Sequence, residues 1–543
     1  MNARTARLCW LAGLVLAACN GGPARGPTAA DAADGAPAAA PQVLRRGNGA
    51  EPVTLDPHKA EGDPELGIVR DLFEGLVGEA QNGSLEPGAA ESWQVAADGK
   101  TYTFALRPDA RWSNGDPVTA DDFVYGFRRS LDPKTGSRYR FILAPIQNAE
   151  AVAAGNLAPT ALGVRAVDER TLEIALERPT PYFLGLLTHP STYPVHRADV
   201  AANGELDDRP GELISNGAYR LARWVRGSYV EATRNPFYWD DASTRIDTVY
   251  YYPTHDVDAE LDRYRAGKLD MTYAVPKKQI RSLRESRPAE LAVAPYFAIY
   301  YYGLNLTRPP FKDNLALRRA LALAIDRDFI AREVTGAGEI PAYGWVPPLP
   351  SYAGQHMPEA EWSQPERETE ARRLYAQAGY SREHPLEIEI LYNTQEDHER
   401  VARAIAAMWK RVLGVETRLK SEEWKVYLES RNRFESQVFR ASWVGDYDDA
   451  FTFLGLLASQ SGLNSTGYAD ARYERLLRAA ETAEGPVARA LALEEAERVL
   501  LDDMPVIPVY FYVTARMVAP WVRGYEENAM DHHLSKDLAV LPH

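Results

Sequence analysis

The chain of 543 residues reads Arg111-Trp112-Ser113-Asn114-Gly115-Asp116-Pro117-Val118-Thr119-Ala120-Asp121-Asp122-Phe123-Val124-Tyr125 in its first quarter, and this segment says more about the architecture than any other. A strand candidate, Thr101–Leu106, precedes it and is rich in β-branched and aromatic residues. Further outward, short strand-like segments alternate with helical ones, and no repeat of fixed period is present. This alternation predicts an α/β or α+β architecture.

The other strand candidates share the composition of the first; they are Thr171–Leu176, Thr248–Tyr252, Leu386–Leu391 and Val506–Val513. Helices are predicted where apolar residues recur on one stripe, over Asn314–Val334, His398–Val412, Arg472–Ala483 and Ala488–Leu501. Asp313 or Asn314 is placed to cap the first of these helices. The last helix should stop before Pro505.

The N-terminus has the pattern of a bacterial export signal. Arg4 and Arg7 precede an apolar run, Leu8–Leu16, that is too short to span a bilayer. The run ends in Leu16-Ala17-Ala18-Cys19, which resembles a lipobox, where cleavage precedes a cysteine that receives a lipid. Residues 1–18 are therefore interpreted as a signal peptide and Cys19 as the lipidation site. A signal peptide cleaved nearby without lipidation is the alternative.

Residues 19–41 are mostly Gly, Ala and Pro with a few charges, which predicts a flexible tether between the lipid and the folded body. Both cysteines of the chain, Cys9 and Cys19, lie before the body. The body is therefore expected to contain no disulfide, no cysteine nucleophile and no cysteine-built metal site.

The composition after Pro41 is that of an ordinary globular protein. About 500 residues exceed what one hydrophobic core usually serves, so two or three compact units are expected. The net charge of -15 becomes -17 when Arg4 and Arg7 leave with the signal, and so nucleic acid is not expected as a partner. The chain has 29 tyrosines against 15 phenylalanines, and side chains with a flat face and a polar tip suit a ligand-lined cleft.

Seven further segments give the segment at 111–125 its meaning; they are Leu55-Asp56-Pro57-His58-Lys59, Arg70-Asp71-Leu72-Phe73-Glu74-Gly75-Leu76, Asn216-Gly217-Ala218-Tyr219, Arg234-Asn235-Pro236, Tyr238-Trp239, Pro310-Phe311-Lys312-Asp313 and Pro505-Val506-Ile507-Pro508-Val509-Tyr510. Each alone is weak. Together, in this order and spacing, they resemble the oligopeptide-binding proteins of ABC importers, family 5 of the extracytoplasmic solute-binding proteins. The resemblance spans nearly the whole chain after the signal.

The resemblance implies an α/β, two-lobed periplasmic-binding-protein (Venus flytrap) fold with mixed sheets and three domains. The expected division is domain I over 42–73, 197–297 and 514–543, domain II over 74–196, and domain III over 298–513. Two crossing segments would serve as the hinge. The implied function is to bind short peptides in the periplasm and to deliver them to the membrane subunits of an ABC permease. The protein is expected to be a monomer without a cofactor, held to a membrane of the cell envelope by its lipid.

The resemblance also implies that Asp446 pairs with the ammonium group of a bound peptide. Asp446 lies in Arg440-Ala441-Ser442-Trp443-Val444-Gly445-Asp446-Tyr447, which is similar to the family stretch whose aspartate has that role. A buried ammonium group is costly unless it is paired and hydrogen-bonded. The alternative is a solvated loop aspartate beside Asp448 and Asp449. In the same stretch Trp443 is expected to wall a side-chain pocket, and Arg440 to meet a peptide carboxylate.

Further site residues rest on the resemblance alone. His398 and Arg431 match positions where relatives place cations for the peptide C-terminus. The other pocket positions are Glu61, Arg70, Tyr139, Tyr273, Tyr301, Trp424 and Tyr512. For the aromatic residues the alternative is core packing, and for Glu61 with Arg70 it is a structural ion pair. His189 is interpreted as a structural histidine rather than a ligand contact.

The sequence departs from the family pattern at several positions. Thr335 stands where relatives often have lysine, and Asp63 stands where they usually have an apolar residue. Ala298 and Val444 replace a cysteine pair that relatives often carry, and Ala274 and Leu463 occupy positions where an amide side chain is common. The loss of both cysteines together is self-consistent. The preferred length and side chains of the peptide are therefore left open.

Two other classes of function stay open. The same fold serves dipeptides, cell-wall peptides, nickel chelates or haem in different relatives, because fold does not fix the ligand. An exported hydrolase is the other rival, but the chain has no His-Glu-x-x-His helix and no Gly-x-Ser-x-Gly elbow. Adjacent His532 and His533 lack a third metal ligand at helical spacing.

Overall fold

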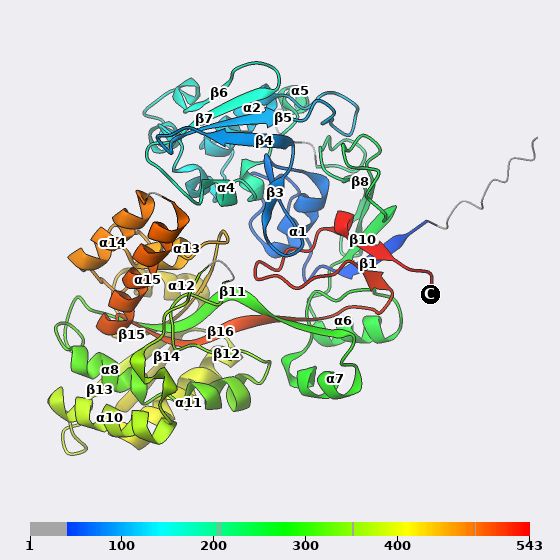
Figure 1. Ribbon diagram of the computed structural model, residues 1–543. Helices are drawn as coiled ribbons and strands as arrows, with labels where there is room; N and C mark the ends of the chain where they lie inside the picture. Colours follow the sequence, from blue (N-terminus) through cyan, green and yellow to red (C-terminus); the bar gives the residue numbers. More distant parts are fainter. Residues whose placement is uncertain (1–40, 204–205, 207, 350–351, 484) are drawn as a thin grey trace, which may run out of the picture. The chain divides into compact units, whose positions relative to one another are not determined.

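The computed structural model describes residues 41–203, 206, 208–349, 352–483 and 485–543. The predicted signal peptide, Cys19 and all of the predicted tether except Pro41 lie outside these residues. Pro41–His543 forms one compact unit. Figure 1 shows its helices and strands.

Among the described residues, three sheets have four or more strands. A mixed sheet has the order β1-β10-β9-β8, with only β1 and β10 parallel. An antiparallel sheet has the order β4-β5-β7-β6. The largest sheet is also mixed and has the order β12-β16-β11-β15-β13-β14. The strands of these sheets are β1 (Val43–Gly47), β4 (Ala90–Val95), β5 (Thr101–Leu106), β6 (Val164–Ala166), β7 (Thr171–Ala175), β8 (Tyr219–Val225), β9 (Tyr229–Arg234), β10 (Thr248–Tyr252), β11 (Leu291–Leu304), β12 (Ile340–Pro341), β13 (Glu387–Asn393), β14 (Glu416–Glu422), β15 (Val438–Val444) and β16 (Val506–Met517).

Two small antiparallel pairs and the helices complete the fold. The pairs are β2 (Val77–Glu79) with β3 (Leu85–Pro87), and β17 (Val522–Arg523) with β18 (Ala539–Val540). The α-helices are α1 (Asp63–Leu72), α2 (Ala120–Leu131), α3 (Ala149–Ala153), α4 (Phe183–Leu186), α5 (Arg197–Asn203), α6 (Val257–Arg265), α7 (Ile280–Ser286), α8 (Leu315–Leu323), α9 (Arg327–Phe329), α10 (Gln364–Gln377), α11 (Glu396–Leu413), α12 (Trp424–Asn432), α13 (Phe451–Leu454), α14 (Ala471–Glu481) and α15 (Pro486–Asp503). Short 3-10 turns are η1 (Arg140–Leu143), η2 (Pro159–Ala161), η3 (Pro190–Thr192), η4 (Lys277–Gln279), η6 (Pro358–Glu361), η7 (Gly455–Leu457) and η8 (Ser535–Asp537), and η5 (Ile330–Thr335) is a π-helical turn.

The segment at 111–125 folds as a turn that leads into α2. Thr119 and Asp122 form a capping box at the start of the helix, which satisfies backbone N–H groups of the first turn. The indole of Trp112 is fully buried and donates to the Asp122 carboxylate at 3.3 Å. The segment is also bonded to a distant part of the chain, since the N–H of Ser113 donates to the carbonyl of Ser215 at 2.7 Å. The motif therefore identifies the fold through packing and capping.

Most predicted elements are confirmed, but the helix predicted over Asn314–Val334 is wrong as a single element. The side chain of Asn314 caps α8 as expected, accepting from the N–H of Leu317 at 3.2 Å. The helix then ends at Leu323, because Asp326 caps a new helix, α9, by accepting from the N–H of Phe329 at 2.9 Å. A polar capping residue inside an apolar stripe thus divides the element.

Buried apolar side chains form three clusters. One draws mainly on residues 44–283 and 517–540, which the predicted division assigns to domains I and II. The other two draw on 297–511, mostly within predicted domain III. The domain boundaries themselves stay a prediction.

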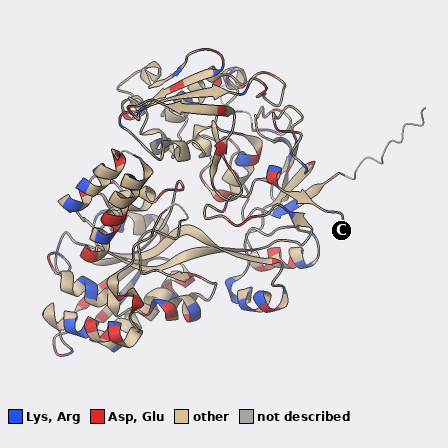
Figure 2. Ribbon diagram, in the orientation of Figure 1, with Lys and Arg blue, Asp and Glu red and all other residues tan. Residues whose placement is uncertain are grey.

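Strands β11 and β16 run side by side and pair along most of their length (Figure 1). Their register shifts between Pro295 and Ile299, so the ladder is interrupted there. The two strands are nearly free of charge, with Arg516 their one ionised side chain (Figure 2). The charged groups near this sheet therefore come mostly from other strands, helices and loops.

Candidate functional site

Asp446 lies in the loop that follows β15, and the backbone around it is closely fixed. Its N–H donates to the hydroxyl of Thr452 at 3.2 Å. The N–H of Gly445 donates to the carbonyl of Phe297 at 2.8 Å. A Cβ at position 445 would lie 2.3 Å from the ring of Phe297, so the close approach requires glycine. This approach sets the position of the Asp446 carboxylate.

The Asp446 carboxylate is desolvated and unpaired. Burial raises its pKa to about 6. Within the described part of the chain, its oxygens have no hydrogen-bond donor and no cation within ion-pair distance. Burying an ionised carboxylate without such partners is costly, and perturbed carboxylates of this kind are typical of functional sites. The arrangement suits the arrival of a cation from outside.

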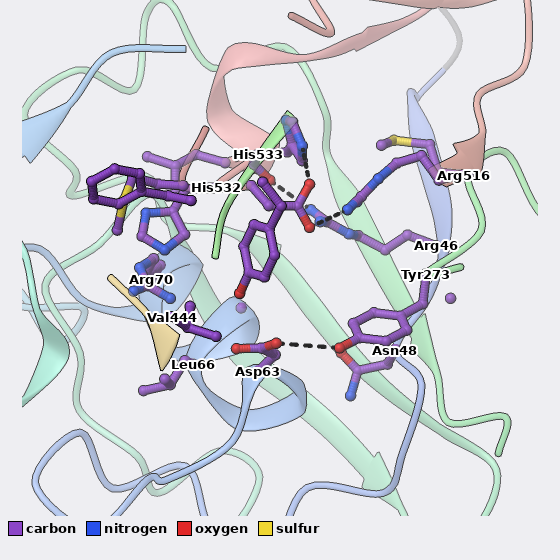
Figure 3. Close-up of a pocket in the computed structure, with 18 of the residues that line it drawn as sticks. Arg46, Asn48, Asp63, Leu66, Arg70, Tyr273, Val444, Arg516, His532 and His533 are labelled. Carbon is purple, nitrogen blue, oxygen red and sulfur yellow. Dashed lines mark hydrogen bonds and ion pairs between the residues drawn. The ribbon is translucent and has the colours of Figure 1, made fainter. Parts of the chain in front are cut away.

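Asp446 and Tyr139 line a first cavity of about 320 Å³. Arg70 and Tyr273 line the same cavity (Figure 3). The hydroxyl of Tyr139 donates to the carbonyl of Glu61 at 3.1 Å. The hydroxyl of Tyr273 donates to the carboxylate of Asp63 at 3.4 Å. Four residues expected from the resemblance thus meet at one cavity although they are far apart in the sequence.

Arg70 is a cation of this cavity that forms no ion pair with a described residue. Among the described residues no carboxylate lies within ion-pair distance of its guanidinium group, and its Nε is buried without a hydrogen-bond partner. Glu61 pairs instead with Arg138 at 3.0 Å, and both side chains are exposed. The alternative of a structural pair between Glu61 and Arg70 is therefore wrong, and Glu61 presents only its carbonyl to Tyr139.

Asp446 also lines a second cavity, of about 610 Å³. Trp443 lines it, as expected for a side-chain pocket, and its indole N–H donates to the Thr452 hydroxyl at 3.4 Å. Asp446 is the one described residue that lines both cavities.

Arg440 forms a separate group on the large sheet. Its guanidinium group donates to the oxygens of Asn393 at 3.2 Å and of Tyr512 at 3.2 Å, and it lies 4.7 Å from the ring centre of Tyr300. No carboxylate pairs with it in the part of the chain that is described. The charge is thus held by neutral oxygens and an aromatic face, which leaves it available to an anion.

His398 and Arg431 approach this group. Burial and, less strongly, the nearby Arg440 lower the pKa of His398 to about 3, so the imidazole is neutral at neutral pH. The ring of Tyr300 lies 5.7 Å from that of His398. The guanidinium group of Arg431 lies 5.7 Å from the ring centre of Tyr427 and forms no ion pair with any described residue.

The remaining expected residues have other surroundings. Tyr301 is buried in the core with its ring 4.8 Å from that of Trp345. Trp424 is exposed and stacks on Tyr427. His189 lines the first cavity, but its Nδ1 is bonded to Ser191, as expected of a structural histidine. Neither cavity is lined by Glu61, Tyr301, His398, Trp424, Arg431, Arg440 or Tyr512.

Some residues of the first cavity were not expected. Arg516 lines it and pairs with Asp531, which also accepts from His533 (Figure 3). No motif marks these residues, because they come from the end of β16 and the C-terminal loop. Asp63, at which the sequence departs from the family pattern, also lines this cavity. Ala298 and Val444, at the two positions where relatives often have a cysteine pair, are direct partners on the neighbouring strands β11 and β15.

The described residues contain no group of three or more His, Cys, Asp or Glu side chains arranged to hold a metal ion. His532 pairs with Glu79 instead. Within the same residues no helix combines the length and apolarity that a membrane span requires.

Comparison with known proteins gives consistent similarities. Residues 84–465 match the family model that is described as "Bacterial extracellular solute-binding proteins, family 5 Middle". The periplasmic oligopeptide-binding protein OppA of Escherichia coli (strain K12) is 41% identical over 520 residues, 95% of each chain. Among solved structures, the unliganded open form of the periplasmic murein tripeptide binding protein MppA has a TM-score of 0.84 at 38% identity, covering 93% of this chain and 98% of that one. Haemophilus influenzae OppA in complex with RPPGFSPFR has a TM-score of 0.75 at 38% identity, covering 92% and 99%.

These similarities confirm the predicted fold class, since the solved relatives are periplasmic binding proteins and the sheets are mixed as expected. The relatives are named as binding proteins rather than enzymes.

Proposed function

Because the chain belongs to the bacterial extracellular solute-binding proteins of family 5, we propose that it binds short peptides in the periplasm and delivers them to an ABC-type permease. The observation that carries the proposal is the Asp446 carboxylate, which is desolvated, lacks a cation among the described residues and opens onto a cavity. The relatives named OppA bind oligopeptides by name, which supports the same class of ligand here.

In this proposal the peptide is held by groups that every peptide carries. Its terminal ammonium group pairs with Asp446, and the charge-assisted hydrogen bonds replace the water that both ions lose. Its main-chain amides pair with exposed protein edges, as in β-augmentation. Its terminal carboxylate meets the cationic group of Arg440 and Arg431, with His398 as a neutral hydrogen-bond donor. Side chains enter the cavities, where water adapts to each sequence.

Calorimetry with a tripeptide and its N-acetylated form tests the central step. Acetylation removes the ammonium charge and should weaken binding at least tenfold, because the buried carboxylate then stays unpaired. Asp446→Ala should weaken binding of the free tripeptide by a similar factor and remove the difference between the two ligands. Asp448→Ala is the matched control, since Asp448 lies two residues away and lines neither cavity. Equal binding of free and acetylated tripeptides to the unmodified protein would reject the assignment of Asp446.

A cell-wall peptide is the second candidate ligand, favoured by the similarity to the murein tripeptide binding protein MppA. Mass spectrometry of the ligand retained through native purification separates the two. A mixture of tri- to pentapeptides supports general peptide binding. A single species containing amino acids of the cell wall supports the second candidate.

The proposal also assigns a lipid anchor to the protein and a role to each domain. Cys19 would carry the lipid, residues 20–41 would hold a monomeric body near the membrane, and domain III would close on domains I and II around the peptide. Cys19→Ser should yield an exported protein found in the soluble periplasmic fraction. Retention of that variant in the membrane fraction would contradict the lipid anchor and leave peptide binding untouched.

A further inference from the structure

The backbone on the N-terminal side of Asp446 is attached to one hydrophobic cluster. The carbonyl of Phe297 accepts from the N–H of Gly445 at 2.8 Å, and the ring of Phe297 is buried in a cluster drawn mainly from residues 297–511. This part of the loop is therefore tied to that cluster.

The residue on the other side of Asp446 belongs to a different cluster. The side chain of Tyr447 is 9% exposed and packs among buried residues drawn mainly from 44–283 and 517–540. Ala450 and Phe453, which follow it closely in the chain, pack in the cluster of Phe297 instead. Asp446 thus lies between two attachments, one to each cluster.

The ring of Tyr182, the residue immediately before α4, makes contact with both clusters. It stacks on the ring of Tyr447, with 4.8 Å between ring centres and 10° between planes, and both rings pack against the same cluster. It also stacks on Phe451, at 5.1 Å and 20°, and Phe451 packs against the other cluster. Aromatic pairs at such separations stabilise a contact beyond the apolar area that they bury. Tyr182 therefore holds two residues of the loop that follows Asp446.

Arg489 of α15 holds the same loop and also contacts Tyr182. Its guanidinium group donates to both carboxylate oxygens of Asp449, at 2.7 and 2.8 Å, and lies 5.8 Å from the ring centre of Tyr182. A bidentate pair of this kind fixes the orientation of both groups as well as their separation. Tyr182 thus takes part in a set of contacts that reaches Tyr447, Phe451 and, through Arg489, Asp449.

We propose that Tyr182 is a positioning residue for Asp446, and that its two ring contacts hold the loop so that the carboxylate is in place for a peptide ammonium group. The inference rests on the proposed function, because it requires that the carboxylate binds this group. A loop that is already ordered loses little conformational entropy when the ligand arrives, and such preorganisation raises affinity. Loss of the ring should therefore reduce the contribution of the ammonium group to binding and leave the other contacts of the peptide in place.

Calorimetry with Ala-Ala-Ala and N-acetyl-Ala-Ala-Ala tests the proposal. The two ligands have the same side chains, so a change in side-chain contacts cancels in the ratio of their affinities. Tyr182→Ala should lower this ratio about threefold to tenfold, the factor expected for the loss of two aromatic contacts. Tyr182→Phe keeps the ring and should retain the ratio of the unmodified protein. An unchanged ratio in Tyr182→Ala, or an equal loss in Tyr182→Phe, would overturn the proposal.

Arg178→Ala is the matched control. Arg178 lies four residues before Tyr182 and pairs with Glu481 of α14 at 3.2 Å, but its side chain is 63% exposed. Exposed pairs contribute little, so this variant should keep the ratio of affinities. A loss in Arg178→Ala as large as that in Tyr182→Ala would overturn the assignment to the ring.

Thermal unfolding checks that the variants fold. If Tyr182→Ala does not fold, Tyr182→Leu keeps apolar bulk without a flat ring and should lower the ratio in the same direction, whereas an unchanged ratio in the folded Leu variant would overturn the proposal. If the unmodified protein binds neither ligand, or binds both equally, the proposed role of Asp446 fails and this inference fails with it. That result is distinct, because it does not depend on any change at Tyr182.

Discussion

Lowering the pH from 7 to 5 should weaken the binding of unblocked peptides about tenfold, because Asp446 takes up a proton in this range. Burial raises the pKa of Asp446 to about 6 in the free protein. An ammonium group bound to the carboxylate favours the ionised form, so the pKa falls in the complex. The affinity is therefore highest at pH 7 and above, and it falls as the pH is lowered through 6.

The magnitude follows from the ionised fraction of Asp446. With a pKa of about 6, roughly nine tenths of the carboxylate is ionised at pH 7 and roughly one tenth at pH 5. The apparent dissociation constant should thus rise about tenfold, provided that the pKa in the complex lies below 5. The peptide keeps its charges between pH 5 and pH 7, since its amine has a pKa of about 8 and its carboxyl a pKa of about 3.5. His398, with a pKa of about 3, stays neutral.

Calorimetry at pH 6 in two buffers of different ionisation enthalpy measures the proton directly. Binding should release about half a proton per peptide, because about half of the carboxylate is protonated before binding. Burial also raises the pKa of Asp448 to about 6, so Asp448→Asn is the matched control and should keep the effect. Asp446→Asn should abolish it. A proton count of zero together with equal affinities at pH 5 and pH 7 would refute the reasoning.

Two further predictions concern stability. Asp446→Asn should raise the free energy of unfolding of the ligand-free protein at pH 7 by about 1–3 kcal/mol, because it removes a charge that burial disfavours, as the pKa of about 6 shows. The gain should disappear near pH 4 in urea denaturation, where the native carboxyl is already neutral, and no gain at pH 7 would contradict the burial of this charge. Gly445→Ala should lower the free energy of unfolding by about 1–3 kcal/mol and weaken peptide binding, since its methyl group meets the Phe297 ring. An unchanged urea midpoint and unchanged affinity would show that the loop has room for it.

Strands were predictable where their pattern was local. Thr101–Leu106 and Thr248–Tyr252 match β5 and β10 to the residue, because alternating burial on one face leaves a clear mark in the sequence. The helix over Asn314–Val334 failed because a single capping side chain, Asp326, outweighed the continuity of the apolar stripe. Capping depends on local hydrogen bonds that periodicity does not record.

The site was predictable only in part, and β11 shows why. Its run Tyr300-Tyr301-Tyr302 is buried on both faces, with Tyr301 in one cluster and its two neighbours in another. Arg440 lies against Tyr300, on the face opposite to Tyr301. A strand buried on both faces gives no sign of which face meets a ligand. The resemblance supplied Asp446, while the second cavity depends on contacts between segments near 141, 182 and 463 that no local pattern connects.

The peptide unit of Phe297 connects β11 both to the loop that carries Asp446 and to the C-terminal segment. It lies where β11 loses its register with β16, its N–H is bonded to the carbonyl of Ala529, and its carbonyl holds Gly445. Through these two hydrogen bonds, a ligand that fixes the position of Asp446 would also restrain the backbone of β11 at Phe297 and the C-terminal segment at Ala529.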